Sequence, residues 1–333
     1  MTWQAKFYKA GDEHGILTLR RAVFGQVDPV RARLNAWKWQ FLNNPAGPGF
    51  IALAKDQGRI VGQYAAIPVR MLVDGVETLC GYSCDTMVHP RYQGQGVFTG
   101  LARQVYAHME SEHGITMVWG FPNKNSMPGF TGSLGWRRVG DLLARVGFTS
   151  FSALLKAGSS PRLDRGWEEA PMERLSLQFD HLWEAHRPLE GIIQVRDRAY
   201  LQWRYLDLPD FGYKVFGLFK SGRLAGYYTL RVQWISGLKV CVLVDCFPLD
   251  CPEAAEQAVK AAKIRAASWG CFMLTALFPI GKNGLASRLG FYPVPKAAAP
   301  KVFHLAGRFK GGGAKLWLDP LRWRLSLGDT DVV

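Results

Sequence analysis

The most constraining feature of this 333-residue chain is an internal repeat. Three segments of the first half recur in the second half, in the same order and at similar spacing. The matched pairs are residues 39–45 with 203–209, residues 55–64 with 220–228, and residues 121–136 with 278–291. Self-similarity of this kind predicts two copies of one fold, the second beginning near Asp164.

Each copy mixes helices with strands. In the first copy, the pattern predicts a helix at residues 12–24, helical or turn structure at 37–42, strands at 50–54, 60–73 and 79–89, a helix at 97–112 and a strand at 115–121. Turn-forming residues separate the first three strands, which predicts an antiparallel meander. The last strand follows a helix, so it should run parallel to the strand before that helix. We therefore expect an α/β fold of the α+β kind, with a mixed sheet in each copy.

A segment of small residues, 157–161, reads Ala-Gly-Ser-Ser-Pro and is typical of a linker. We expect a first domain at residues 1–157, a second at residues 164–305 and a C-terminal extension at residues 306–333. A hydrophobic content of 48% supplies enough apolar side chains for both cores. One chain would then form an internal pseudo-dimer, either as a monomer or within a homodimer.

The formal net charge of +14 should attract anions, such as nucleic acid, anionic lipid, acidic carrier proteins or phosphorylated small molecules. The chain has no block of five or six basic residues, so we expect no nucleic-acid partner. In the C-terminal extension, basic residues alternate with aromatic ones, and we interpret them as a solvated face.

The six cysteines include no Cys-x-x-Cys pair and no neighbouring histidine at ligand spacing, so we expect no metal. Their apolar neighbours suit buried thiols in a reducing compartment. The N-terminal segment lacks the pattern of a signal peptide. The longest apolar run, residues 271–280, is too short to span a bilayer. These observations predict a cytoplasmic protein without a membrane span.

Residues 85–98 combine a strand end, a glycine loop and the first turn of a helix, with the loop spelled Arg91-x-x-Gly94-x-Gly96. Unpaired N–H groups at a helix start bind anions, and glycines at positive φ turn successive amides inward without a blocking Cβ. The first helical turn carries no acidic residue. The pattern predicts a diphosphate site. A P-loop is excluded because no Gly-Lys-Ser or Gly-Lys-Thr follows, and a dinucleotide fold is disfavoured because a meander precedes the loop.

The second copy differs at this point. Its strand end, residues 244–248, is followed by the acidic segment 250–253 rather than by glycines, and Glu256 falls in the first helical turn. We expect Asp250 to cap this helix and Pro252 to occupy its first position. Carboxylates at the positive end of a helix dipole repel a diphosphate. The second copy should therefore have lost the anion site and kept the scaffold.

The glycine loop, the strand end before it and the order of elements resemble the acyl-CoA site of the GNAT N-acetyltransferase superfamily. Motif detail covers residues 83–136, and element order extends the resemblance to two tandem GNAT-like domains with a degenerate second copy. The resemblance implies acetyl-CoA or another acyl-CoA as co-substrate, whose pantetheine arm would pair with the backbone of Met87 and Val88. Further contacts would come from the amides of Gln93, Gly94, Gln95, Gly96, Val97 and Phe98, and from Asn123 or Asn125.

The implied reaction is the attack of an amine on an acyl thioester, which needs a base for the ammonium proton and donors for the oxyanion. Asp85 is the candidate base, with a structural carboxylate as its alternative role. His89 is the rival base, because imidazole titrates close to neutral pH. Many family members place an acidic tyrosine where this chain has Thr131. Tyr82, Ser126 or water would then protonate the leaving thiolate.

The expected acceptor is a small-molecule amine, such as an amino sugar or an amino acid. Residues 203–205 are candidate contacts for it, although their repeat partners at 39–41 favour a packing role. Asp245 matches Asp85 in the second copy, which keeps a scaffold role open for both. An acidic acyl-carrier protein or an aminoacyl-tRNA would be an alternative donor, suited to the positive charge. A non-catalytic acyl-CoA-binding regulatory protein is the alternative outside enzymes.

Overall fold

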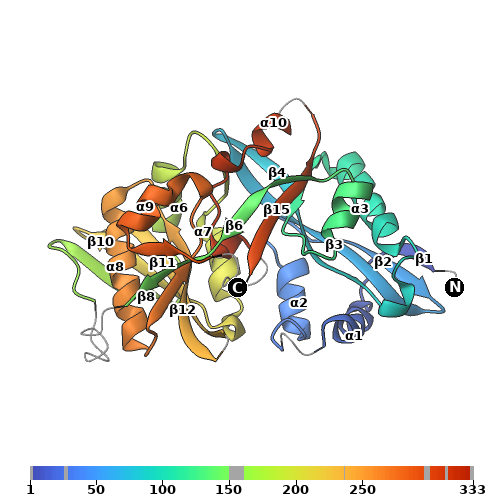
Figure 1. Ribbon diagram of the computed structural model, residues 1–333, viewed down its shortest axis with the longest axis horizontal. Coiled ribbons are helices and arrows are strands. Elements are labelled where there is room, and N and C mark those ends of the chain that lie inside the picture. Colours follow the sequence, from blue (N-terminus) through green and yellow to red (C-terminus); the bar gives the residue numbers. More distant parts are fainter. Residues whose placement is uncertain are drawn as a thin grey trace. The chain divides into compact units, whose positions relative to one another are not determined.

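The computed structural model describes residues 3–25, 29–149, 161–235, 237–295, 301–311 and 314–330 (Figure 1). Most of the expected linker therefore lies outside the described residues. The chain forms two compact units. The first comprises Met1–Met71, Glu77–Gly140 and His304–Asp319, and the second comprises Leu72–Val76, Asp141–Phe303 and Pro320–Val333.

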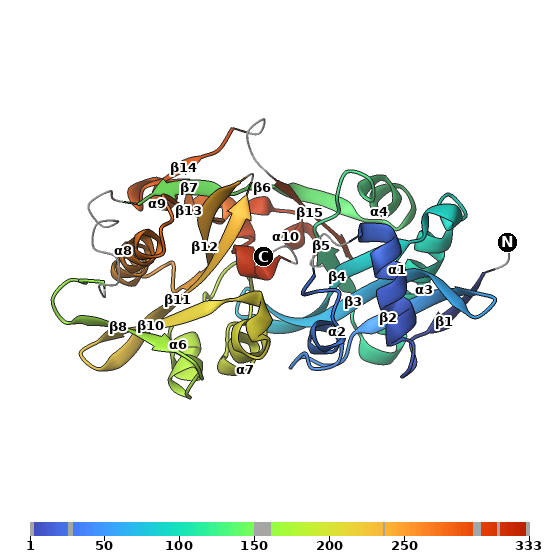
Figure 2. The ribbon, with the colours of Figure 1, turned by 90° about the horizontal axis from the view of Figure 1, so that it is seen from below.

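The first unit is a mixed sheet with the strand order β1-β2-β3-β4-β5-β15-β6. Its strands are β1 (Gln4–Phe7), β2 (Phe50–Asp56), β3 (Arg59–Val73), β4 (Val76–Val88), β5 (Met117–Gly120), β6 (Arg137–Leu143) and β15 (Val302–Phe309). Its helices are α1 (Glu13–Phe24), α2 (Leu34–Phe41), α3 (Val97–His113), α4 (Met127–Ser133) and α10 (Ala314–Trp317). In both views α1 and α2 lie on one face of the sheet and α3 on the other (Figures 1 and 2). The predicted meander and the parallel β4–β5 pair are confirmed.

The helix α3 attaches to the sheet through one apolar stripe. The stripe consists of Val97, Leu101, Ala102, Val105 and Met109, all buried. These positions recur at three- and four-residue intervals, so they share one helical face. They form a single core with residues of β2 and β3. Full burial of each larger side chain contributes about 1.5–3 kcal/mol, and Gly114, at φ 65°, ends the helix.

The second unit repeats this plan with the strand order β14-β7-β13-β12-β11-β10-β8. The strands of this sheet are β7 (Arg145–Phe148), β8 (Trp167–Met172), β10 (Lys214–Lys220), β11 (Arg223–Ile235), β12 (Leu238–Phe247), β13 (Met273–Ala276) and β14 (Phe291–Pro293). The unit also contains β9 (Ile192–Gln194), which lies outside this sheet. Its helices are α6 (Gln178–His186), α7 (Arg198–Leu201), α8 (Pro252–Ser268) and α9 (Asn283–Arg288). Like β4 and β5, β12 and β13 run parallel and are joined by a helix of 17 residues. The predicted repeat is therefore present in the fold.

One strand of each unit comes from the other half of the chain. β15 pairs with β5 in the first unit, with Ala306 opposite Gly120 and Phe309 opposite Met117. β7 lies between β13 and β14 in the second unit, a green strand among orange ones in Figure 2. The two units consequently have other bounds than the expected ranges 1–157, 164–305 and 306–333. A short strand encodes its own extended conformation but not which sheet it will join.

All six cysteines are free thiols, and all but Cys251 are buried. Within the described residues, no helix is long and apolar enough to cross a membrane. The same part of the chain contains no group of three or more His, Cys, Asp and Glu side chains placed to hold a metal ion.

Candidate functional site

The end of β4 extends past its parallel neighbour. The register of β4 with β5 pairs Gly81 with Val118 and Tyr82 with Trp119. β4 continues to Val88, whereas β5 ends at Gly120 and pairs with β15 along its other side. Residues 83–88 therefore run beyond the part of β4 that pairs with β5, which is where the sequence predicts the donor cleft.

The loop after β4 is open above the start of α3. Gly94 and Gly96 both have φ 73°, and Gly96 is the N-cap of α3 with no side-chain capping bond. A Cβ placed on either glycine would meet no atom within 4 Å. The first turn of α3 contains no acidic residue, so its unpaired N–H groups face no protein anion of their own helix. This geometry suits a diphosphate.

Hydrogen bonds made by three side chains of the loop stabilise its conformation. The Tyr92 hydroxyl donates to Asp56 Oδ2 at 2.7 Å. Gln95 Nε2 donates to the Arg91 carbonyl oxygen at 2.9 Å. Gln93 Nε2 donates to the Val88 carbonyl oxygen at 3.2 Å. A strand-like ligand that pairs with Val88 must displace this last contact.

Backbone alternation distinguishes the two residues predicted to pair with pantetheine. The His89 N–H donates to the Val61 carbonyl oxygen on β3 at 2.9 Å. Because successive residues of a strand point their polar groups to opposite sides, those of Val88 and Thr86 face away from β3. Val88 and Thr86 thus offer the free edge, whereas the backbone of Met87 faces β3.

The other residues predicted to contact the acyl donor lie at the start of α3 and in the turn before α4. Val97 and Phe98 begin α3, and the Phe98 ring packs against Phe130 at a centroid distance of 4.9 Å. Asn123 Oδ1 accepts the backbone N–H groups of Asn125 and Ser126, both at 2.9 Å. Asn123 thereby shapes the turn before α4, and the exposed Asn125 side chain is the freer of the two.

Asp85 lies where β4 kinks. Its φ is 48°, and its backbone carbonyl oxygen accepts a hydrogen bond from Gln63 Nε2 at 2.9 Å. Its Oδ1 accepts a hydrogen bond from Arg20 of α1 at 2.6 Å, and the Asp85 side chain is 12% exposed. Within the described residues, Oδ2 has no partner. One carboxylate oxygen is therefore fixed by a cation, while the other is left unpaired in that part of the chain.

The other predicted acid–base groups are less open. His89 Nδ1 accepts the Arg91 backbone N–H at 3.3 Å, which leaves the proton of a neutral ring on Nε2. The Tyr82 ring is buried and packs on Trp119 at 4.8 Å. Ser126 Oγ accepts the Asn123 N–H at 3.1 Å and is thus engaged in the turn. Among these groups, Asp85 keeps a carboxylate oxygen without a protein partner in the described part of the chain.

A pocket of about 620 Å³ adjoins the exit of β4 on the α1 side of the first unit. Small residues of α1 and the turn before β3 leave the space, and His89, Arg59 and Arg91 line it. Neither arginine side chain has an acidic partner among the described residues. Asp12 also lines the pocket, and its carboxylate contacts Lys55. The pocket thus contains two arginines without an acidic partner and falls in the size range of small-molecule sites, about 300–1,000 Å³.

The second unit fills the position of Asp85 with a closed polar cluster. Asp245, 2% exposed, accepts hydrogen bonds from Arg196 Nε (3.1 Å), Tyr205 Oη (3.1 Å) and Tyr227 Oη (2.9 Å). Arg196 also donates to Asp329 Oδ2 at 2.8 Å. Burial raises the pKa of Asp329 above its ordinary value, because two carboxylates share one guanidinium away from water. These contacts assign Asp245 a scaffold role.

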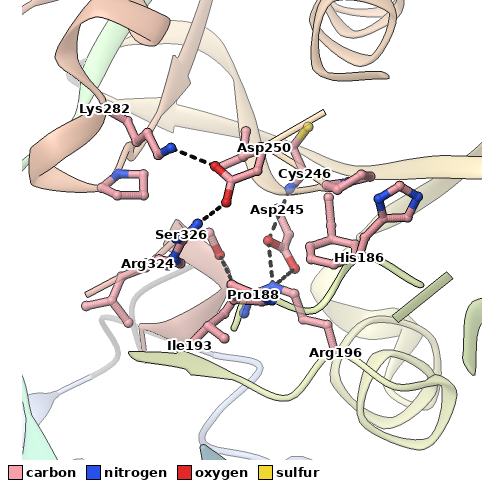
Figure 3. A pocket seen from close by; sticks show the side chains of 15 residues that line it. His186, Pro188, Ile193, Arg196, Asp245, Cys246, Asp250, Lys282, Arg324 and Ser326 are labelled. Carbon is pink, nitrogen blue, oxygen red and sulfur yellow. Dashed lines mark hydrogen bonds and ion pairs between the residues drawn. The ribbon is translucent and has the colours of Figure 1, made fainter. Parts of the chain in front are cut away.

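The second unit also fills the position of the glycine loop. A small cavity of about 40 Å³ lies at the end of β12, and Figure 3 shows the side chains that line it. There Asp250 contacts Lys282 Nζ at 2.6 Å and also Arg324. The prediction that Asp250 caps α8 is wrong, because the N-cap is Cys251 and it makes no side-chain capping bond. Pro252 does occupy the first helical position.

The sequence does not predict three of the ion pairs in these two units. Arg20 is 65 residues from Asp85, Arg196 is 49 from Asp245, and Asp329 is 133 from Arg196. No local pattern links such pairs. The matched positions of Asp85 and Asp245 in the repeat were the signal that a cationic partner should be sought for each.

The sequence of the first unit matches a known domain. Residues 4–139 fit the family model of the acetyltransferase (GNAT) domain. Within these residues the chain therefore contains a GNAT domain. The predicted resemblance is confirmed by this match. No curated protein matches the sequence.

Solved GNAT-like structures extend the likeness to both units. A probable N-acyltransferase from Enterococcus faecalis has 14% identity and a TM-score of 0.67, covering 93% of this chain and 73% of that chain. A GCN5-related N-acetyltransferase from Kribbella flavida has 15% identity and a TM-score of 0.63, with coverages of 92% and 71%. The myristoyl-CoA complex of N-myristoyltransferase from Saccharomyces cerevisiae has 11% identity and a TM-score of 0.58, with coverages of 93% and 80%. At these identities the likeness shows the fold, a tandem of two mixed α/β units.

Proposed function

We propose that this GNAT protein is an N-acyltransferase that uses acyl-CoA, with acetyl-CoA as the first candidate, to acylate a small-molecule amine. The observation that carries the proposal is the open loop at Gly94 and Gly96, which combines two left-handed glycines with an uncapped helix start. A diphosphate placed there would meet converging N–H groups and the positive end of the α3 dipole. The Gln93 N–H already donates to the Pro90 carbonyl oxygen at 3.4 Å, so the amides of Gly94 to Phe98 are the foremost proposed donors.

The thioester would lie along the free edge of β4. An extended pantetheine arm can pair with the backbone of Val88 once the Gln93 side chain moves aside. The N–H groups that face away from β3, those of Thr86 and Val88, are then the proposed donors to the oxyanion. Asp85 lies at the kink of β4, and His89 lines the pocket at the exit of this strand.

Asp85 is the proposed base. Its free Oδ2 would take a proton from the acceptor ammonium, whose nitrogen then attacks the thioester carbon. The new C–N bond forms and the C–S bond breaks. The second proton of the attacking nitrogen passes through water to the CoA thiolate, because Thr131 replaces the family tyrosine and donates to the Met127 carbonyl oxygen. Arg20 holds the carboxylate in place throughout.

The acceptor is proposed to be a small amine such as an amino sugar or an amino acid. The pocket beside His89 supports a ligand of this size, and its two unpaired arginines favour one that carries an acidic group. An acidic acyl-carrier protein is the alternative donor that the net charge of +14 would favour.

Calorimetry with CoA and thiol release from acetyl-CoA test this function. We expect one CoA per chain, bound by the first unit, and thiol release with at least one member of a panel of amino acids, amino sugars and polyamines. Asp85→Asn should lower turnover by about 10²–10⁴-fold, the range for a lost general base, with CoA affinity unchanged. Absence of CoA binding would refute the proposal.

The replacement of the family tyrosine by Thr131 favours a second candidate, a non-catalytic acyl-CoA-binding protein. It is distinguished by its outcome in the same assay. Tight CoA binding without thiol release, whatever amine is added, would support this candidate over the enzyme. Poor competition by free CoA against an acylated carrier protein would instead support the carrier as donor.

A further inference from the structure

In the second unit, a lysine pairs with a carboxylate near the start of α8, the helix that follows the central strand. Lys282 lies between β13 and α9, and Asp250 lies between β12 and α8. The Lys282 Nζ contacts Asp250 Oδ1 at 2.6 Å (Figure 3). Asp250 lies two residues before Pro252, the first residue of α8. Its carboxylate is an internal anion at the helix start.

The first unit has a lysine at the matching place. Both copies carry a Phe-Pro dipeptide after the second parallel strand and a Lys-Asn dipeptide shortly after it. The dipeptides are Phe121-Pro122 with Lys124-Asn125, and Phe278-Pro279 with Lys282-Asn283, with one additional residue between them in the second copy. Lys124 is therefore the repeat partner of Lys282.

The matching place on the other loop is empty of charge. Two residues before Val97, the first residue of α3, the first copy has Gln95 between its two left-handed glycines. Lys124 is exposed and has no side-chain partner among the described residues. The first copy thus keeps the lysine and lacks the carboxylate that occupies its counterpart.

We propose that Lys124 binds the diphosphate of CoA, in the position where Lys282 binds Asp250. This inference rests on the proposed function and adds a residue to its donor site. The lysine would close the site from the α4 side, opposite the amides at the start of α3. A charge-assisted contact of this kind also explains why the loop after β5 begins with a turn fixed by Asn123, since that turn fixes the backbone from which Lys124 extends.

The test compares CoA with pantetheine, which lacks the diphosphate, by calorimetry on the full chain. We expect Lys124→Met to weaken CoA binding by about 10-fold or more, the effect of losing one hydrogen bond to a charged group. Pantetheine affinity should stay the same. Lys124→Met should fold normally, because the side chain is exposed.

Two lysine variants control for the loss of charge alone. Lys6→Met removes an exposed charge from β1 of the same unit, and Lys282→Met removes the repeat partner. Both should bind CoA as the wild type does. Equal CoA affinity of Lys124→Met and wild type would overturn the inference, as would an equal loss for pantetheine. A wild type that binds no CoA would instead overturn the proposed function.

Discussion

The two copies of the scaffold differ most in the segment after their central strand. After β4 the chain forms an open loop with two left-handed glycines and an uncapped helix. After β12 the same position holds Asp250 between Lys282 and Arg324, and Glu253 accepts from Trp167 Nε1 at 3.0 Å. Both helices are 17 residues long, so the scaffold is alike and the chemistry is not. One copy presents a helix start without acidic residues, and the other places its own carboxylates there.

The strand ends themselves repeat the contrast. Asp245 makes its hydrogen bonds to Arg196 and two tyrosines in a buried cluster, whereas Asp85 contacts Arg20 through one oxygen at a partly exposed site. A carboxylate whose acceptor positions are filled can hold a fold together but cannot take a proton from a substrate. The comparison therefore sets a carboxylate with filled acceptor positions against one that keeps an unpaired oxygen, at the same position of one fold.

The largest expected effect concerns stability. Asp245→Ala leaves Tyr205, Tyr227 and Arg196 Nε without their acceptor in a buried site. We expect the free energy of unfolding to fall by about 3–5 kcal/mol, the cost of breaking a buried charged pair. Urea unfolding followed by circular dichroism measures it.

The matched variant is Asp85→Ala. It should cost less stability, about 1.5–3 kcal/mol, because one charge-assisted hydrogen bond is lost instead of contacts to three donors. It should also abolish thiol release while Asp245→Ala, at a temperature where it is folded, retains it. Equal stability losses would show that the two carboxylates are the same kind of group.

The next effect concerns binding. Gly96→Val should reduce CoA affinity by about 100-fold or more, because a β-branched side chain resists φ 73° and projects into the open space proposed for the diphosphate. Calorimetry measures the affinity, and circular dichroism checks that the fold persists.

Gly114→Val is the control for backbone strain. Gly114 ends the same helix at φ 65°, and a Cβ there also meets no atom within 4 Å. Both variants should lose similar stability, but Gly114→Val should bind CoA normally. If the two variants lose CoA binding equally, the loop is not the anion site.

The sequence predicts much of this comparison and misses part of it, for physical reasons. The helix α3 and the glycine loop are encoded by local signals, an apolar stripe and two glycines before a helix without acids. The repeat reveals the second copy because its turns reuse the same residues. The exchange of β7 and β15 between the sheets has no such signal, since strand pairing is set by tertiary packing. The ion pairs of Asp85 and Asp245 join elements distant in the chain, so only the fold brings them together.

The smallest expected effect is weak anion binding gained by the second copy. Asp250→Asn removes the carboxylate that Lys282 and Arg324 share, leaving two cations beside the cavity of Figure 3. In a Gly96→Val background, which silences the first site, we expect this change to confer weak binding of pyrophosphate that the Gly96→Val protein lacks. The loss of exposed ion pairs should cost the fold only about 0–1 kcal/mol.

CoA is the discriminating ligand for this variant. It should still not bind to the second unit, because Pro252 and Glu253 begin α8 where the first copy has a glycine N-cap and no acid. Calorimetry with pyrophosphate and CoA separates the two requirements. Binding of pyrophosphate without CoA would mean that the two freed cations suffice for binding an anion. It would also mean that CoA binding further requires the glycines of the first copy's loop. No gain for either ligand would mean that Asp250 does not stand in the place of the diphosphate, and the repeat would then offer no guide to Lys124.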